Sequence, residues 1–141
     1  MEPSSAVAVD LDVLGDVGPL WRAWLEDAGR RARVDSLDPA ALDEQLPNWR
    51  ALLQHFAEDH APVYLRPSAP VTLSLRRLQA SGAAIGVFTG YPEELARLAL
   101  AHLGASRRVG SLECGAGAEE RLVSALGPGT RVVRTPSELD F

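Results

Sequence analysis

The sequence predicts an α/β fold in which a parallel sheet of about four strands is flanked by helices. Short apolar runs with the composition of buried strands recur at 6–10, 83–88, 108–112 and 131–134. Segments with apolar residues at helical spacing separate these runs, and Gly82, Gly104 and Gly127 stand where three of the helices should end. Strands that alternate with helices are joined by right-handed crossovers, so we expect the strands to run in parallel.

The first strand leads into a long helical stretch. We expect three helices there, at 19–33, 39–46 and 47–60. The chain's three tryptophans, Trp21, Trp24 and Trp49, fall on the apolar faces of the first and third of these helices. Tryptophan at helical spacing is usually core, so packing between helices is their expected role.

The second half of the chain repeats a strand–helix pattern. After a proline-rich connection at 61–70, the expected elements are a helix at 71–80, a strand at 83–88, a helix at 93–103, a strand at 108–112, a helix at 118–126 and a strand at 131–134.

Composition restricts the class of protein. The 141 residues should form one domain, with 46% hydrophobic and 23% charged residues. A net charge of −5 argues against nucleic acid or an anionic membrane as a partner. We expect no membrane span and no signal peptide, and a single Cys114 is typical of the reducing cytoplasm, where it should be a packed, inert residue. Oligomeric state does not follow from the sequence.

Two carboxylates end the first strand, where Val9 is followed by Asp10, Leu11 and Asp12. Residues two apart in an extended chain point the same way, so their charges should repel and raise the pKa of one or both carboxyls. A divalent cation would offset that repulsion and leave one carboxylate available as a nucleophile. The alternative is an acidic, solvated turn with Asp12 or Asp16 as a helix N-cap.

A hydroxyl and a glycine end the second strand. Thr89 and Gly90 precede Tyr91 and Pro92, and a helix should open there. The Thr89 hydroxyl and a backbone N–H can bind one phosphate oxygen at such a strand end. The alternative is an ordinary turn with Thr89 as an N-cap.

An apolar run ending in Asp-x-Asp, paired with a later apolar run ending in Thr-Gly, resembles the haloacid dehalogenase-like hydrolase superfamily. The resemblance implies a Rossmann-like three-layer sandwich with strand order 4-1-2-3 and a small helical cap that covers the site. It divides the chain into a core, 1–16 and 61–141, and a cap, 17–60.

The resemblance also implies roles for individual residues. Asp10 would attack phosphorus, Asp12 would act as acid and base, and Thr89 with Gly90 would bind the phosphoryl group. The implied cofactor is Mg²⁺, held by the Asp10 carboxylate and the Asp12 carbonyl, and the substrate would be a small phosphorylated metabolite.

The chain departs from the family pattern in its basic side chains. The family carries a lysine that neutralises the phosphoryl group, but all 14 basic residues here are arginine. Arg108, before the third strand, and Arg121, on the following helix, are the candidates to replace it, although either can be an ordinary surface residue. Arginine is a planar fork rather than a point charge and needs a different placement.

Two further departures concern the turn after the first strand and the last acidic motif. Val13, Leu14 and Gly15 follow Asp12, whereas the family usually has glycine directly after the second acid. A Gly-Asp and a second acid should follow the fourth strand to complete the magnesium sphere. Here Glu138 is the best placed acid and Asp140 the next, and the alternative for both is a solvated tail.

Two functional classes follow. The first is a Mg²⁺-dependent phosphomonoester hydrolase that works through an aspartyl-phosphate on Asp10. The second is a degenerate, catalytically impaired member that acts as a binding or interaction module. A dehalogenase-like hydrolase is a third class, disfavoured because such members usually lack the second aspartate.

Overall fold

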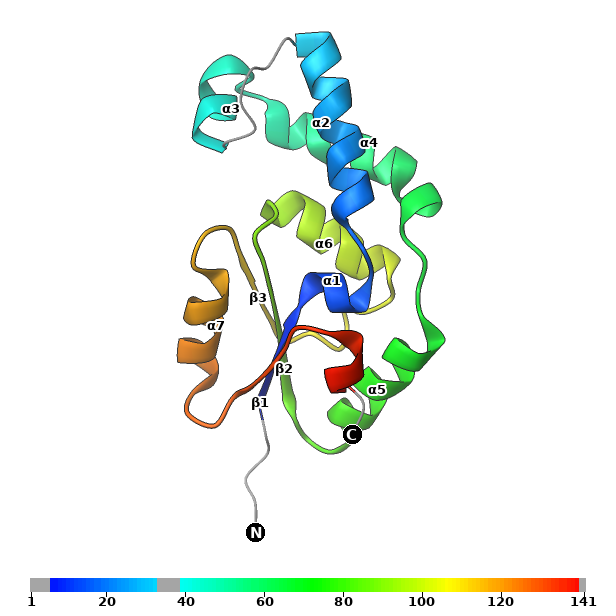
Figure 1. The fold of residues 1–141 in the computed structure, drawn as a ribbon, viewed down its shortest axis with the longest axis vertical. Coiled ribbons are helices and arrows are strands. Elements are labelled where there is room, and N and C mark those ends of the chain that lie inside the picture. Colours follow the sequence, from blue (N-terminus) through cyan, green and yellow to red (C-terminus); the bar gives the residue numbers. More distant parts are fainter. Residues whose placement is uncertain (1–5, 33–38, 140–141) are drawn as a thin grey trace.

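A computed structural model, which describes residues 6–32 and 39–139, has the predicted α/β fold, with a parallel sheet between helices (Figure 1). The strands are β1 (Ala6–Asp10), β2 (Ala84–Thr89), β3 (Ser111–Cys114) and β4 (Arg131–Val133). Their order is β3-β2-β1-β4 and every pairing is parallel. Counted from the β4 edge, β1 lies between β4 and β2, with β3 beside β2, which are the neighbours expected from the sequence.

Helices cover both faces of the sheet. They are α1 (Leu11–Leu14), α2 (Gly18–Ala32), α3 (Pro39–Gln45), α4 (Trp49–Tyr64), α5 (Ala69–Ala80), α6 (Glu93–His102) and α7 (Ala118–Leu126), followed by the 3₁₀ turn η1 (Pro136–Leu139). Figure 1 shows α7 on one face of the sheet, α5 and α6 on the other, and α2 to α4 grouped beyond the edge at which β1 and β2 end. The result is a Rossmann-like three-layer sandwich with helices above the carboxyl edge of its strands.

The strand residues alternate between two cores. Val9 and Val87 face the larger core, towards α5 and α6, whereas Ala8 and Phe88 face the smaller one, against Leu122 of α7. Alternation along each strand follows from the pleat of the sheet. Because both faces of β1 are buried, its residues read as a continuous apolar run, the pattern by which it was predicted.

The sheet approaches α7 closely at Gly86. A Cβ at this position would lie 2.6 Å from Leu122 Cδ1 and 2.8 Å from Ser111 Oγ. Both contacts are shorter than real Cβ atoms show, so the side chains of Leu122 and Ser111 would have to shift to admit one.

The helices at 18–64 share the larger core with the sheet. Trp24, Trp49 and Leu53 belong to the same cluster of buried side chains as Val9 and Val87. The expected packing role of Trp24 and Trp49 is therefore confirmed, while Trp21 is partly buried against the same cluster. The division of the chain into core and cap stays a prediction, because one continuous core joins the two parts.

The main differences from the sequence prediction concern α4, β3 and α1. Helix α4 continues to Tyr64, through Pro62, instead of ending near residue 60. Pro62 has no N–H to donate to the Glu58 carbonyl, yet the helix continues past it: the buried Ala61 and Leu65 extend the apolar face, and the Leu65 N–H donates to the Ala61 carbonyl at 2.7 Å.

Strand β3 begins at Ser111, not at residue 108, because its register places Ser111 opposite Gly86, where β2 is already buried. The turn α1 was not predicted at all. It is a single turn of helix and too short to show a helical period in the sequence.

The three glycines expected at helix ends have positive φ angles, 86° at Gly82, 74° at Gly104 and 98° at Gly127. These values confirm the prediction, since this region favours glycine over residues with a Cβ. Among the described residues, no helix is long and apolar enough to cross a membrane.

Replacing Gly86 by alanine should destabilise the protein by about 1–3 kcal/mol, because the added methyl overpacks the contact with Leu122. Urea unfolding measures this change. Gly29→Ala on α2 is the matched control, because a Cβ there meets nothing within 4 Å. Alanine is more favourable than glycine inside a helix, so this variant should raise the free energy of unfolding by about 0.5–1 kcal/mol. A Gly86→Ala protein as stable as the wild type would show that α7 is not seated on the sheet as described.

Candidate functional site

The carboxyl edge of β1 and β2 carries a hollow of about 370 Å³. Its lining comes from four elements, β1, α1, α2 and β2, and from the loop after β2, and consists of Asp10, Asp12, Trp21, Phe88, Thr89, Gly90, Tyr91 and Pro92. The strand register explains why residues from the ends of β1 and β2 lie together. Asp10 pairs with Phe88, so the two strands end within one residue of each other. The structure thus brings together the four residues that the two sequence motifs named, Asp10, Asp12, Thr89 and Gly90.

Asp10 is the last residue of β1 and also the N-cap of α1. Its Oδ1 accepts a hydrogen bond from the Asp12 N–H at 3.1 Å. The chain turns into a helix directly after Asp10, so the expectation that an extended chain aligns the two carboxylates is wrong. They share the hollow because Asp12 lies in the first turn of α1, which folds back over the end of the strand.

Asp12 ties the turn between α1 and α2. Its Oδ1 accepts the Val17 N–H at 3.1 Å, and Asp16 Oδ1 accepts the Gly18 N–H at 3.1 Å at the start of α2. Asp16 lies one residue before the N-cap position of α2, Val17, so it supports the start of the helix without being the N-cap of the alternative. Each of these carboxylates uses Oδ1 for its hydrogen bond, so Oδ2 is the atom that a cation or a phosphorus atom would approach.

The pKa of the Asp12 carboxyl is raised, first by partial burial and then by the charges of Asp10 and Asp16. The Val17 N–H opposes this by favouring the charged form. The pKa of the Tyr91 hydroxyl is also raised, by burial and by the charges of Asp12, Asp16 and Asp10, against the opposing charge of Arg22. The hollow therefore has a negative potential.

Thr89 is the buried last residue of β2, with a side chain only 4% exposed. Its Oγ1 accepts the Tyr91 N–H at 3.2 Å, which folds the chain over Gly90, and its carbonyl accepts the Gly115 N–H at 2.9 Å. The hydroxyl still carries a proton that it can donate into the hollow. Gly90 is exposed, and a Cβ there would meet nothing within 4 Å. Thr89 thus stabilises a turn and lines the hollow, but it is not the helix N-cap of the alternative, because the N-cap of α6 is Pro92.

The other three predicted site residues are not in this lining. Arg108 precedes β3, so it lies towards the opposite edge of the sheet, and its buried Nε has no hydrogen-bond partner among the described residues. Arg121 closes the loop after β3, donating to Glu113 Oε1 at 2.9 Å and to the carbonyls of Cys114 and Ala116 at 2.6 and 2.5 Å.

Glu138 caps η1 at the end of the described chain. Its Oε1 accepts the N–H groups of Arg134 and Thr135 and the Thr135 hydroxyl, and these bonds lower its pKa. Its carboxylate is thus committed to its own turn. Asp140 lies outside the described residues.

Two groups near the hollow were missed in the sequence. Tyr91 lies in the lining and its ring packs 5.9 Å from that of Trp21. Arg134 follows β4 at the same edge as Asp10 and forms a two-point ion pair with Glu119, at 3.0 and 2.6 Å. Its pKa is raised mainly by Glu119 and slightly by the charge of Asp10. Both could have been found from their positions close to the ends of predicted strands.

The side chains of this hollow offer the type of ligand that Mg²⁺ prefers, but only two of them. Asp10 and Asp12 supply carboxylate oxygens, and Mg²⁺ in proteins is commonly held by one or two carboxylates with water and substrate phosphate. Within residues 6–32 and 39–139, no group of three or more His, Cys, Asp or Glu side chains is placed to hold a metal ion. Any such ion would depend on a bound phosphate for its remaining ligands.

Comparison with known proteins does not place the chain in a family. No protein-family model matches the chain, and no curated protein matches it.

Asp12→Asn should raise the melting temperature at neutral pH by about 1–2 °C, measured with EDTA present. The raised pKa means that the folded protein binds this proton more tightly than the unfolded chain does. That stabilisation is complete below the ordinary carboxyl pKa of about 4 and is lost as the pH rises through the folded value. Asparagine avoids the loss and keeps an oxygen for the Val17 N–H.

A pH series of melting curves supplies the control, because the advantage of Asp12→Asn should shrink as the pH falls towards about 4. A variant less stable than the wild type at neutral pH would mean that the Val17 hydrogen bond to the charged carboxylate outweighs burial and repulsion.

Proposed function

We propose that the protein is a Mg²⁺-dependent phosphomonoester hydrolase that works through an aspartyl-phosphate on Asp10. The supporting observation is the single hollow lined by Asp10, Asp12, Thr89 and Gly90. The same residues carry the resemblance to haloacid dehalogenase-like hydrolases. The substrate would be a small phosphorylated metabolite.

The chemistry follows from the two carboxylates. Asp10 Oδ2 attacks phosphorus, the P–O ester bond breaks, and the Asp12 carboxylic acid gives its proton to the departing alkoxide. Water then attacks the phosphorus of the aspartyl-phosphate while Asp12 takes back a proton, which releases inorganic phosphate and restores Asp10. A raised pKa suits Asp12 to this role, because it keeps the acid protonated nearer to neutral pH than an ordinary aspartate.

Thr89 and Gly90 would hold the phosphoryl group. The Thr89 hydroxyl can donate to one phosphoryl oxygen, and the loop at Gly90 lets the backbone approach another without steric contact. When bound between Asp10 and the Asp12 carbonyl, Mg²⁺ would neutralise charge on the phosphoryl oxygens. Asp10 and Asp12 then no longer oppose an anionic substrate.

A catalytically impaired binding module is the second candidate, and a specific observation favours it. Arg121, Arg134 and Glu138, the side chains best placed to replace the family's lysine and last acids, are all held in local contacts. A ligand would have to break those contacts to use them.

Asp10→Asn should abolish turnover of p-nitrophenyl phosphate, because an amide cannot attack phosphorus. Asp12→Asn should slow it by about two to four orders of magnitude through loss of acid–base help. Steady-state release of p-nitrophenol with Mg²⁺, and again with EDTA, measures both effects. Asp59→Asn, the same change on the exposed side of α4, is the matched control and should keep wild-type turnover.

Wild-type activity should disappear with EDTA and return with Mg²⁺. Absence of Mg²⁺-dependent turnover across a broad panel of phosphate esters would decide for the binding module. Turnover of 2-haloacids instead would decide for a dehalogenase.

A further inference from the structure

A second hollow, of about 640 Å³, adjoins the first. Gly90 and Pro92 line both, so the loop after β2 separates them. A ligand with its phosphoryl group at Thr89 can extend across Gly90, where the chain presents no side chain and even a Cβ would meet nothing within 4 Å. The second hollow is therefore placed for the alcohol part of a phosphate ester.

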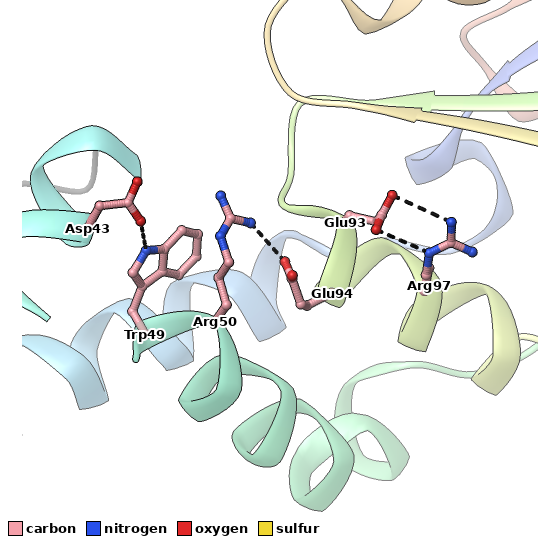
Figure 2. A network of polar contacts seen from close by, with 6 residues as sticks. All are labelled: Asp43, Trp49, Arg50, Glu93, Glu94 and Arg97. Carbon is pink, nitrogen blue, oxygen red and sulfur yellow. Dashed lines mark hydrogen bonds and ion pairs between the residues drawn. The ribbon is translucent and has the colours of Figure 1, made fainter. Parts of the chain in front are cut away.

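Its walls come from helix α4 and from elements at the carboxyl edge of the sheet. Trp49 and Arg50 stand on α4, Glu93 and Glu94 begin α6, and residues 112–115 end β3. Figure 2 shows Arg50 between the ring of Trp49 and the carboxylate of Glu94. The Arg50 guanidinium carbon lies 4.4 Å from the centre of that ring, and its Nη1 lies 3.0 Å from Glu94 Oε1.

The lining carries more negative than positive charge. Glu93, Glu94 and Glu113 supply three carboxylates, whereas Arg50 is the one cation among the lining residues described for this hollow. The ion-pair partners of Glu93 and Glu113, Arg97 and Arg121, lie outside the lining and offset part of this negative charge from behind the wall.

The lone thiol at this wall reports the same potential. The pKa of Cys114 is raised to about 11, first by burial and then by the charge of Glu93, with Glu113 and Glu94 adding to the effect against the opposing charge of Arg97. Burial disfavours a cation as well as a thiolate, so only the contributions of the three glutamates to this pKa agree with a negative potential at the wall.

We propose that this second hollow binds the alcohol part of the substrate and selects alcohols that carry a primary ammonium group. The inference rests on the proposed hydrolase function. The ammonium would lie among Glu94, Glu113 and the Trp49–Arg50 pair, and the short carbon chain would lie over Gly90. Hydrolysis of such an ester yields inorganic phosphate and a free amino alcohol.

The test compares O-phosphorylethanolamine with propyl phosphate, which has a similar length and carries methyl in place of ammonium. The wild-type kcat/KM should favour the ammonium ester by at least about fivefold, mostly through KM, as expected for a few partly exposed charge contacts. The preference should shrink as the ionic strength rises from about 0.02 to about 0.5 M, because salt screens exposed charges.

Two variants should move this ratio in opposite directions. Glu113→Gln removes a carboxylate and should lower the preference by about two- to fivefold. Arg50→Gln removes the lining cation and should raise it by a similar factor. Glu44→Gln, on the exposed side of α3, is the control and should keep the wild-type ratio. A purely structural disturbance would affect both esters alike.

Equal kcat/KM values for the two esters, or variants that shift the ratio in the same direction, would overturn the inference and leave the hydrolase function standing. If neither ester nor p-nitrophenyl phosphate is hydrolysed, the hydrolase function fails, and binding of the same pair is compared by amide NMR. Tighter binding of the ammonium ester, with shifts at residues 112–115, would then support selection by this hollow. Equal binding of the two would reject it.

Discussion

The parallel register of β1 against β2 is the constraint on which the rest of the site depends. Asp10 pairs with Phe88, and the three residues before Asp10, Val7 to Val9, are buried between two neighbouring strands and two helical layers. Sliding β1 by one residue would turn its apolar side chains to the wrong faces and break ladders on both sides. The position of Asp10 beside Thr89 is therefore a consequence of burial several residues earlier.

Charge at this edge is only partly balanced by the chain itself. Backbone N–H groups of Asp12, Val17 and Gly18 each offset part of one carboxylate's charge, yet the pKa of Asp12 remains raised. Arg22 offsets part of this charge near Tyr91, but Arg121 and Arg134 do not complete the balance, because their guanidinium groups are held in fork-like contacts with glutamates and carbonyls. A guanidinium committed in this way cannot turn to a phosphoryl group as a flexible lysine would. The site thus favours a cation or a proton from outside the chain.

Helices α2 and α4 link the two hollows through one row of aromatic rings. Trp21 lines the first hollow and stacks 5.5 Å from Trp24, which in turn lies 5.9 Å from Trp49 behind the second. The Nε1–H of Trp49 donates to Asp43 at 2.7 Å, which satisfies the polar edge of this buried ring (Figure 2). Trp21 thus packs against the other rings and lines the first hollow, whereas Trp24 and Trp49 are almost fully buried, so changes at these two should act on stability first.

The sequence by itself determined the order of strands and helices, the ends of β1 and β2, and the meeting of Asp10 with Thr89, because an apolar run must stop where its side chains meet water. It could not determine that Asp12 lies on a single helical turn, since four residues show no period. Nor could it show which arginines were available: the chain offers 14, and only the folded contacts reveal that Arg121 and Arg134 are engaged. The second hollow depends on α4 packing against α6, with Arg50 reaching Glu94 across 44 residues of chain. Contacts of that range are set by the tertiary structure, because local sequence constrains only near neighbours.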